Sequence, residues 1–487
     1  MLGLSSVAVN AGKGFGVASL IPTANTTTLG KVGFFNLSTG ASIGTLNVGY
    51  HPDNVTFSPD GSKLIVVNEG EFNPSSGTNA PGSISVIDVS SITSSNLGDL
   101  TSLTPVTWDF SAGNLGPGVS LSGIRNPNIA AVGTNGTFIA NVPDFTNVAN
   151  QDPNAIEPEY ASVVGNKVYV SLQENNAIGE FDLVTEKWTK VSSLGTITQT
   201  IDASDQNNSG VADNLISITK SVRGLPMPDS IATYTSGNKT YVVTANEGDA
   251  RGDDRDISRF GDISGNDSMN NIIDTNAPSN FLLTQTGERT NEQLGRLNVS
   301  RLDGDTDGDG KIDAPTMIGT RSMSIWEVTE TGLTRTYDTG SFLETYISLN
   351  DPTGWVDSRS DDKGPEPEGL VVGQIGDRTY AFIGMERTHG IFMFDVTDPV
   401  SPTFVDYKRI SSGSIPLRPE GFSFVSANDS PNGQALVIIG FEGDGTASSE
   451  RVVVFSAVPE PSTYALIALS FGLVVWHLRR KGASAKV

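Results

Sequence analysis

The sequence contains no cysteine and only three histidines. It can therefore form neither a disulfide bond nor a thiolate metal site, and the redox compartment cannot be inferred from it. Any metal site must be built mainly from carboxylate and carbonyl oxygens. These ligands favour calcium or magnesium over zinc.

Positive charge is also scarce. Lys and Arg number 31 against 55 Asp and Glu, which gives a formal net charge of −24. This field would repel a polyanion, so nucleic acid is excluded as a partner, whereas divalent cations are compatible with such a surface. The chain further lacks a G-x-S-x-G elbow, a Walker loop and a G-x-G-x-x-G motif. We therefore expect no organic cofactor, and nucleophilic catalysis has little support.

What the chain does contain is a repeat. Charged residues make up only 18%, and 53 glycines suit an all-β protein with many turns. One pattern occurs five times: proline, an acid, an alternating apolar strand, a turn, a second strand and a second acid. The copies are 52-PDNVTFSPDGSKLIVVNEG-70, 158-PEYASVVGNKVYVSLQEN-175, 228-PDSIATYTSGNKTYVVTANEG-248, 367-PEGLVVGQIGDRTYAFIGMER-387 and 419-PEGFSFVSANDSPNGQALVIIGFEGD-444.

The midpoint of each copy lies in a cluster of Gly, Asn, Asp or Pro, which is the chemistry of a hairpin turn. A third strand follows each copy, at 83–89, 177–183, 322–328, 390–396 and 451–457. A further unit without the Pro-acid pair has strands at 5–9, 14–20 and 31–37. Six units of short antiparallel strands predict an all-β fold, a β-propeller.

In a propeller the repeated acids would form a ring at one mouth of the central channel. Residues equidistant from a hairpin turn face each other, so the two acids of each copy should be neighbours. The predicted rim acids are Asp53, Glu69, Glu159, Glu174, Asp229, Glu247, Glu368, Glu386, Glu420 and Glu442. Crowded carboxylates must be protonated, bound to metal or paired with a cation, for which Arg387 and Arg418 are candidates.

Two interpretations of this ring remain open. The acids could accept backbone N–H bonds from the next blade and only hold the ring together, or they could form a metal or catalytic site. His51 and His389 lie close to the motifs and could reach the rim, although each is more often a structural residue.

Three insertions, at about 91–156, 190–225 and 250–320, are expected to leave one rim of the propeller as loops. The last contains 303-DGDTDGDGKID-313, which has the spacing of an EF-hand-type calcium loop. Its predicted ligands are Asp305, Asp307, Asp309, the Lys311 carbonyl and Asp313. Position 12 is Thr316 rather than glutamate, so the bidentate ligand is absent and the affinity for calcium should be modest. The alternative is a solvated acidic turn.

The C-terminus carries an apolar run, 464–478, followed by Arg479, Arg480 and Lys481. A helix of fifteen residues spans about 22 Å, short of the roughly 30 Å hydrocarbon core, but snorkelling arginines could let it span. A buried terminal helix is the alternative. With Pro459, Glu460 and Pro461, the segment 458–487 resembles a PEP-CTERM sorting signal. That resemblance implies export, a short C-terminal hydrophobic helix, transient inner-membrane anchoring, processing by an exosortase-type protease and display on the outer surface.

Residues 1–457 resemble the choice-of-anchor I domain, related to a mesenchyme-specific cell-surface glycoprotein family. The resemblance rests on 158-PEYASV, 171-SLQENNAIGEFDL-183, 244-TANEGDARG-252, 294-LGRLNVSRLDGDTDGDGKID-313, 357-DSRSDDKGPEPEGL-370 and 395-DVTDP-399. It implies a seven-bladed propeller, of which about six blades are present here. It also implies one more N-terminal unit and a leader ahead of residue 1, so an N-terminally truncated chain is expected.

These observations favour an exported, envelope-displayed calcium-binding propeller with a non-catalytic role at the surface or in the extracellular matrix. Its ligands would be polysaccharide or mineral ions. The alternative function is a calcium-dependent phosphoesterase at the channel mouth, by analogy with propeller phytases, and a fold-level analogy is weak evidence.

Overall fold

The structure is a computed structural model. It describes residues 2–24, 27–73, 77–93, 96–126, 147, 151–208, 211–251, 256–261, 289–412, 415–443 and 450–457. The rest of the chain, including the sorting segment with Pro459, Glu460 and Pro461, lies outside the described residues. Within them, no helix is both long and apolar enough to cross a membrane.

Six antiparallel sheets correspond to the six units expected from the sequence. The first contains β1 (Leu2–Asn10), β2 (Phe15–Pro22), β3 (Lys31–Asn36) and β4 (Ser42–Asn47). The second contains β5 (Pro52–Phe57), β6 (Lys63–Asn68), β9 (Ser83–Asp88) and β10 (Val106–Asp109). The third contains β11 (Pro158–Val164), β12 (Lys167–Leu172), β13 (Ala177–Asp182) and β14 (Lys187–Ser193).

The remaining three sheets follow the same order. The fourth contains β17 (Ile231–Ser236), β18 (Lys239–Asn246), β22 (Ser322–Thr329) and β23 (Gly332–Asp338). The fifth contains β24 (Pro367–Ile375), β25 (Arg378–Met385), β26 (Gly390–Asp395) and β27 (Thr403–Arg409). The sixth contains β30 (Arg418–Val425), β31 (Leu436–Glu442) and β32 (Arg451–Ser456).

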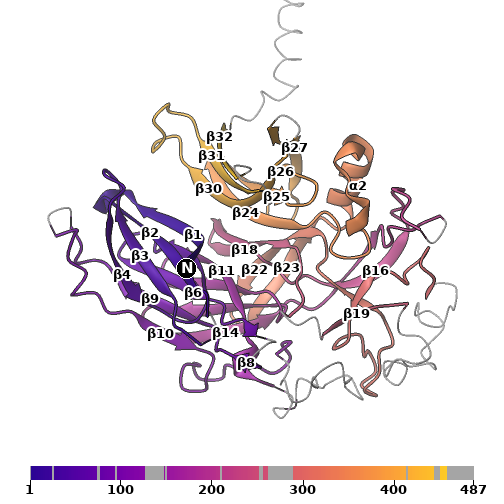
Figure 1. The fold of residues 1–487 in the computed structure, drawn as a ribbon, viewed down its shortest axis with the longest axis horizontal. Helices are drawn as coiled ribbons and strands as arrows, with labels where there is room; N and C mark the ends of the chain where they lie inside the picture. The colour runs from indigo at the N-terminus through magenta and orange to yellow at the C-terminus, as the bar shows by residue number, and fades with distance from the viewer. Residues whose placement is uncertain are drawn as a thin grey trace, which may run out of the picture.

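The first strand of each sheet contacts the first strand of the next, in the order β1, β5, β11, β17, β24 and β30. In Figure 1 the sheets accordingly follow one another in chain order, from indigo to yellow, about a common centre. A buried apolar cluster lies between each successive pair of sheets. Between the second and third, for example, Ile65 and Ile84 pack with Trp188. The all-β propeller prediction is confirmed.

The insertions are less loop-like than expected. Part of 91–156 forms β10, the outermost strand of the second sheet. The other two insertions build a five-stranded sheet from β15 (Ile197–Ile201), β16 (Lys220–Leu225), β19 (Ile257–Arg259), β20 (Asn298–Ser300) and β21 (Thr316–Ile318). This sheet has its own core, which includes Val222, Phe260 and Met317. It lies to one side of the other six (Figure 1).

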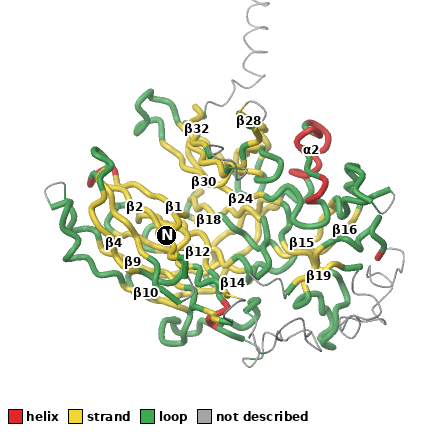
Figure 2. The backbone as a smooth tube through the Cα atoms, viewed as in Figure 1, coloured by secondary structure: helices red, strands yellow, loops and turns green. Residues whose placement is uncertain are grey.

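One α-helix lies between two of the propeller sheets. Helix α2 (Phe342–Asn350) joins the fourth and fifth sheets and buries Leu343 and Ile347. Figure 2 shows it in red above the five-stranded sheet. Short elements complete the described structure: η1 (Ala11–Lys13), β7 (Phe72–Asn73), β8 (Thr78–Asn79), η3 (Pro153–Ala155), η7 (Pro352–Gly354), η8 (Asp357–Arg359), β28 (Ser411–Ser412) and β29 (Ile415–Pro416).

Close backbone packing between the fifth and sixth sheets yields a stability prediction. A Cβ added at Gly369 in β24 would clash with the Glu420 carbonyl oxygen of β30 and lie 2.5 Å from the Phe422 ring, whereas a Cβ at Gly421 would meet nothing within 4 Å. We expect Gly369→Ala to lower the free energy of unfolding by about 1–3 kcal/mol, as overpacking does. Gly421→Ala is the matched control and should leave it unchanged. Equal effects of the two substitutions in urea denaturation would contradict the close approach.

Candidate functional site

The first acid of a copy lies at a β-bulge. Strand pairing shifts register just after the proline, between Pro52 and Val55 in β5 and between Pro367 and Leu370 in β24. The shift recurs in β11 and β30. Pro52 pairs with Asn68, so Asp53 does not pair directly with Glu69. The predicted facing of the two acids was therefore wrong in register, because a bulge inserts a residue and re-aims the side chain beside it.

A left-handed backbone conformation precedes three of the prolines. His51, Met227 and Glu366 have φ values of 46°, 46° and 55°. Non-glycine residues seldom adopt this conformation because it costs energy, and the residues that do adopt it are concentrated at functional sites. The carbonyl groups of His51 and Glu366 each accept a hydrogen bond of 2.8 Å, from the N–H groups of Glu69 and Glu386. This link between the residue before the proline and the second acid of a copy was missed, because no residue preference marks it.

The structure brings the predicted rim acids together. Burial raises the pKa of Asp53 to about 7, and the charges of Glu69 and Glu420, from the second and sixth sheets, add to the effect. Burial likewise raises the pKa of Asp229, helped by Glu247 and Glu420. Burial and neighbouring rim acids also raise the pKa of Glu159 in the third sheet and of Glu368 in the fifth, so carboxylates from five sheets act on one another, which requires a common location.

Three of the buried rim acids have few hydrogen-bond donors. Glu159, Asp229 and Glu174 are only 8%, 8% and 7% exposed. Among the described residues, no other residue donates a hydrogen bond to their side-chain carboxylates. The interpretation in which the acids serve as acceptors for backbone N–H groups of the next blade is therefore not supported for these residues. Buried carboxylates without donors need a proton or a cation.

Cations lie beside other second acids of the repeat instead. The Arg387 Nη1 is 2.7 Å from the Glu386 Oε1, and the Arg418 Nη1 is 3.9 Å from the same oxygen. Both predicted basic partners therefore reach the rim. Sequence reasoning missed Lys363, whose Nζ lies 2.6 Å from the Glu247 Oε1. The only signal was the charge-rich run 357-DSRSDDKGPEPEGL-370, which carries no spacing rule.

Two further glutamates on the residues before the prolines were also missed. Glu366 is fully buried and binds Arg387 through its Oε2 at 3.0 Å and Arg359 through its Oε1 at 2.6 Å. Glu157 is almost fully buried and lies 3.5 Å from the Arg251 guanidinium. In each pair the glutamate and the arginine neutralise each other. These arginines are therefore largely unavailable to the other rim acids.

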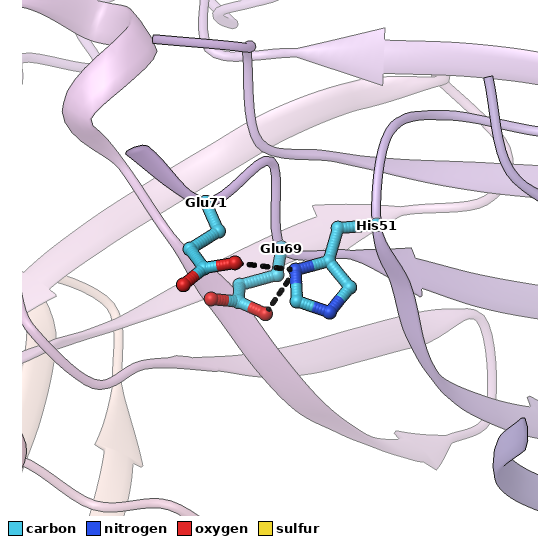
Figure 3. Close-up of side chains that lie close together, drawn as sticks. All are labelled: His51, Glu69 and Glu71. Carbon is cyan, nitrogen blue, oxygen red and sulfur yellow. Dashed lines mark ion pairs between the residues drawn. The ribbon is translucent and has the colours of Figure 1, made fainter. Parts of the chain in front are cut away.

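Figure 3 shows another group of side chains at the rim, formed by His51, Glu69 and Glu71. The His51 Nδ1 lies 2.9 Å from the Glu69 Oε2 and 3.3 Å from the Glu71 Oε2. Burial lowers the pKa of His51, but hydrogen bonds to the two glutamates outweigh it and raise this pKa to about 10. The imidazolium is therefore the cation for Glu69. By contrast, burial and the charge of Arg418 lower the pKa of His389 to about 4, so that ring is neutral.

The predicted calcium loop is a compact turn. The Asp305 carboxylate accepts the N–H groups of Gly308 and Gly310 at 2.7 and 2.8 Å. One oxygen each from Asp305, Asp307 and Asp313 lie within 4.8 Å of one another. Asp309 is not in this group, and its carboxylate lies 3.5 Å from the Lys311 Nζ.

Asp313 is the buried member of the loop, with 1% exposure. Its Oδ2 accepts a 2.6 Å hydrogen bond from the Thr306 N–H, whereas its Oδ1 is buried with no donor among the described residues. Thr316, at position 12, lies in β21 and bonds the Ala314 carbonyl. The loop thus offers an unmatched buried oxygen but lacks the usual bidentate ligand.

Arg125 anchors this loop to the rim. Its guanidinium lies 2.9 Å from Asp303, 2.6 Å from Asp256 and 2.9 Å from the Glu174 carbonyl oxygen. The residue comes from the first insertion and is buried. The loop is therefore tied to the third sheet at a rim acid.

Comparison with known proteins identifies the family. A family model for the choice-of-anchor I domain matches residues 2–399. The chain belongs to this family. A second match, to the PEP-CTERM protein-sorting motif, covers residues 457–481. This motif marks the choice-of-anchor I protein as exported and associated with the cell envelope, and it implies exosortase processing and membrane anchoring.

Relatives of this choice-of-anchor I chain include Gigasin-3a from Magallana gigas, 28% identical over 182 residues, covering 32% of this chain and 63% of the relative. The Mesenchyme-specific cell surface glycoprotein of Strongylocentrotus purpuratus is 28% identical over 226 residues, covering 40% of this chain and 28% of the relative. The chain thus spans less than two thirds of both relatives. A similar solved structure, Kuenenia stuttgartiensis hydrazine synthase, has a TM-score of 0.42 at 11% identity, covering 94% of this chain and 84% of that one.

Proposed function

We propose that this exported protein is a calcium-binding propeller with a non-catalytic role at the cell surface or in the extracellular matrix. The observation that carries the proposal is the 305–313 loop, where three aspartates place oxygens within 4.8 Å of one another. A relative described as a cell surface glycoprotein supports the surface role. Polysaccharide and mineral ions are the ligands that we propose for the displayed surface.

Charge supports a cation in the loop. Five aspartates lie within eleven residues, from Asp303 to Asp313, and Arg125 compensates only the first of them. Like charges at such spacing repel unless a cation intervenes. Without a glutamate at position 12, we propose a dissociation constant of about 10⁻⁴–10⁻³ M, the range of extracellular calcium modules.

The calcium loop can be tested by neutralising two ligands. We expect Asp305→Asn with Asp307→Asn to weaken calcium binding at this site by about tenfold or more, because each removes a charged ligand. Isothermal titration calorimetry measures the loss. The matched control is Asp398→Asn with Asp406→Asn, which removes the same charge from exposed positions outside the loop. A loop variant that titrates like this control would show that the loop is a solvated acidic turn.

A second candidate function is a calcium-dependent phosphoesterase. The observation that favours it is the position of Arg387 and Arg418 beside Glu386, because phosphoryl transfer needs cations converging where charge develops. Hydrolysis of a generic phosphomonoester with calcium present tests it, with Glu368→Gln plus Glu420→Gln as the control variant. Equal turnover by the two proteins would remove this candidate.

A further inference from the structure

Three rim carboxylates from two blades converge at the channel mouth. One oxygen each from Asp229, Glu247 and Glu368 lie within 4.8 Å of one another. Asp229 and Glu247 come from the fourth blade and Glu368 from the bulge that opens β24 of the fifth. The group therefore exists only because two consecutive blades are packed side by side.

Asp229 is the residue that points to a ligand. It is more than nine-tenths buried, and within the described ranges nothing donates a hydrogen bond to its carboxylate. Glu368 adds a buried Oε2 that likewise has no donor there. Both side chains direct an oxygen toward the same small volume. An unpaired buried carboxylate is costly, so a cation or a proton must stabilise this arrangement.

Glu247 is held in place by two donors. Its Oε1 accepts from the Lys363 Nζ at 2.6 Å, and its Oε2 accepts from the Gln173 Nε2 at 3.0 Å. A carboxylate oxygen has a second lone pair, so these bonds orient the group without exhausting its capacity to bind a metal. Lys363 supplies one positive charge beside three carboxylates, so net negative charge remains for a divalent ion to balance.

The spacing of the three oxygens and the cations already bound to neighbouring acids favour this group as the site of a divalent ion. Oxygens bound to one calcium ion at about 2.4 Å lie at most about 4.8 Å apart, so the spacing of these three oxygens is compatible with calcium, and calcium accepts several protein carboxylates whereas magnesium usually keeps more of its water. The neighbouring group of Glu247, Glu366 and Glu386 already holds Arg359 and Arg387. The group of Glu69 and Glu71 already holds the His51 imidazolium.

We propose that Asp229, Glu247 and Glu368 form a second divalent-cation site, suited to calcium, which links the fourth and fifth blades at the channel mouth. This site is separate from the 305–313 loop and does not depend on it. Burial, with repulsion from neighbouring carboxylates, also raises the pKa of Asp229 and Glu368, so calcium competes with protons there.

Calorimetric titration of the full chain with calcium tests the site. We would compare wild type, the mouth variant Asp229→Asn with Glu368→Gln, and the loop variant Asp305→Asn with Asp307→Asn. The mouth variant should bind one calcium ion fewer than wild type, and the loop variant should retain the mouth site. The Asp398→Asn, Asp406→Asn protein serves as the charge-matched control and should match wild type.

A thermal melt in EDTA separates a lost site from a lost fold. Without metal, the mouth variant should melt at or above the temperature of wild type, because two repelling charges are gone, yet calcium should stabilise it less. If the double variant does not fold, Glu368→Gln alone gives the same comparison, because that side chain is only half-buried. Unchanged calcium stoichiometry in the mouth variant, or complete loss of binding in the loop variant, would overturn the proposal. A loop variant with full stoichiometry would count against the calcium loop alone.

Discussion

Replacing Arg321 with methionine is expected to lower the free energy of unfolding by about 3–5 kcal/mol, as breaking a buried ion pair does. Arg321 is 1% exposed, precedes β22 and pairs with the equally buried Glu344 of α2 at 2.9 Å. Its guanidinium also donates to the carbonyl groups of Asp202, Ser360 and Asp362 at 2.7–2.9 Å. The side chain thus joins the five-stranded sheet, α2 and the segment before β24.

The expected loss of stability in Arg321→Met has two causes: the unpaired charge of Glu344 and the three carbonyl groups without a donor. A second substitution can separate them. Glu344→Gln in the Arg321→Met background removes the stranded charge, so part of the stability should return. The remainder should persist because the three carbonyl groups still lack a donor. Arg409→Met is the matched control, because Arg409 is 36% exposed and pairs with Asp351 at 3.3 Å, a contact worth about 0–1 kcal/mol. Urea denaturation measures each value, and a cost for Arg321→Met no larger than that of Arg409→Met would refute the argument.

The second prediction with a large expected effect concerns how the stability of the metal-free protein depends on pH. In EDTA, stability should fall as the pH rises from about 4 to about 8. Burial raises the pKa of Glu247 to about 7 and of Glu386 to about 8 in the folded protein. The folded state therefore holds protons that the unfolded state has released, and stability decreases with pH across this window. A tenfold difference in proton affinity between the two states is worth about 1.4 kcal/mol, so the rim acids together should change the free energy of unfolding by a few kcal/mol across this window.

His51 acts in the same direction at higher pH. Its pKa is raised to about 10 by Glu69 and Glu71 against the desolvation that lowers it. Its contribution to stability is fully present below about pH 6.5 and is lost as the pH rises toward 10. Saturating calcium should flatten the profile between pH 5 and 8, because the ion binds the deprotonated carboxylates. Thermal melts across this range, with and without calcium, give the measurement.

The mouth variant Asp229→Asn with Glu368→Gln is the control for this profile. Its stability in EDTA should change less with pH than that of wild type, because two of the repelling carboxylates are neutral at every pH. A wild-type stability that increases between pH 5 and 8 in EDTA would contradict the raised pKa values of the rim acids.

The rim illustrates which parts of a site can be predicted. Asp53 and Glu69 could be placed near one another because both flank a hairpin whose turn residues, at Gly61, are plain in the sequence. The register could not be predicted, because the bulge after Pro52 depends on contacts with neighbouring strands. Lys363 could not be predicted as the partner of Glu247, because the two lie 116 positions apart in the chain and only the packing of two blades brings them into contact.

The insertions show the same limit on a larger scale. Segments rich in Ser, Asn and Asp resemble loops when each is considered alone. The structure pairs β16 with β21, which lie far apart in the chain, and buries Val222 against Met317. Neither strand has an apolar face long enough to indicate this pairing locally.

The amino-acid sequence alone determined the repeat, the turns, the class of fold and the types of ligand available, because alternation, turn residues and composition act over short distances. The five-stranded sheet, the bulges, the buried Arg321 network and the assignment of cations to particular acids were decided only by the tertiary structure. The sheet and the bulges depend on contacts between strands that lie far apart in the chain, and the ion pairs depend on charges that packing brings together and removes from water.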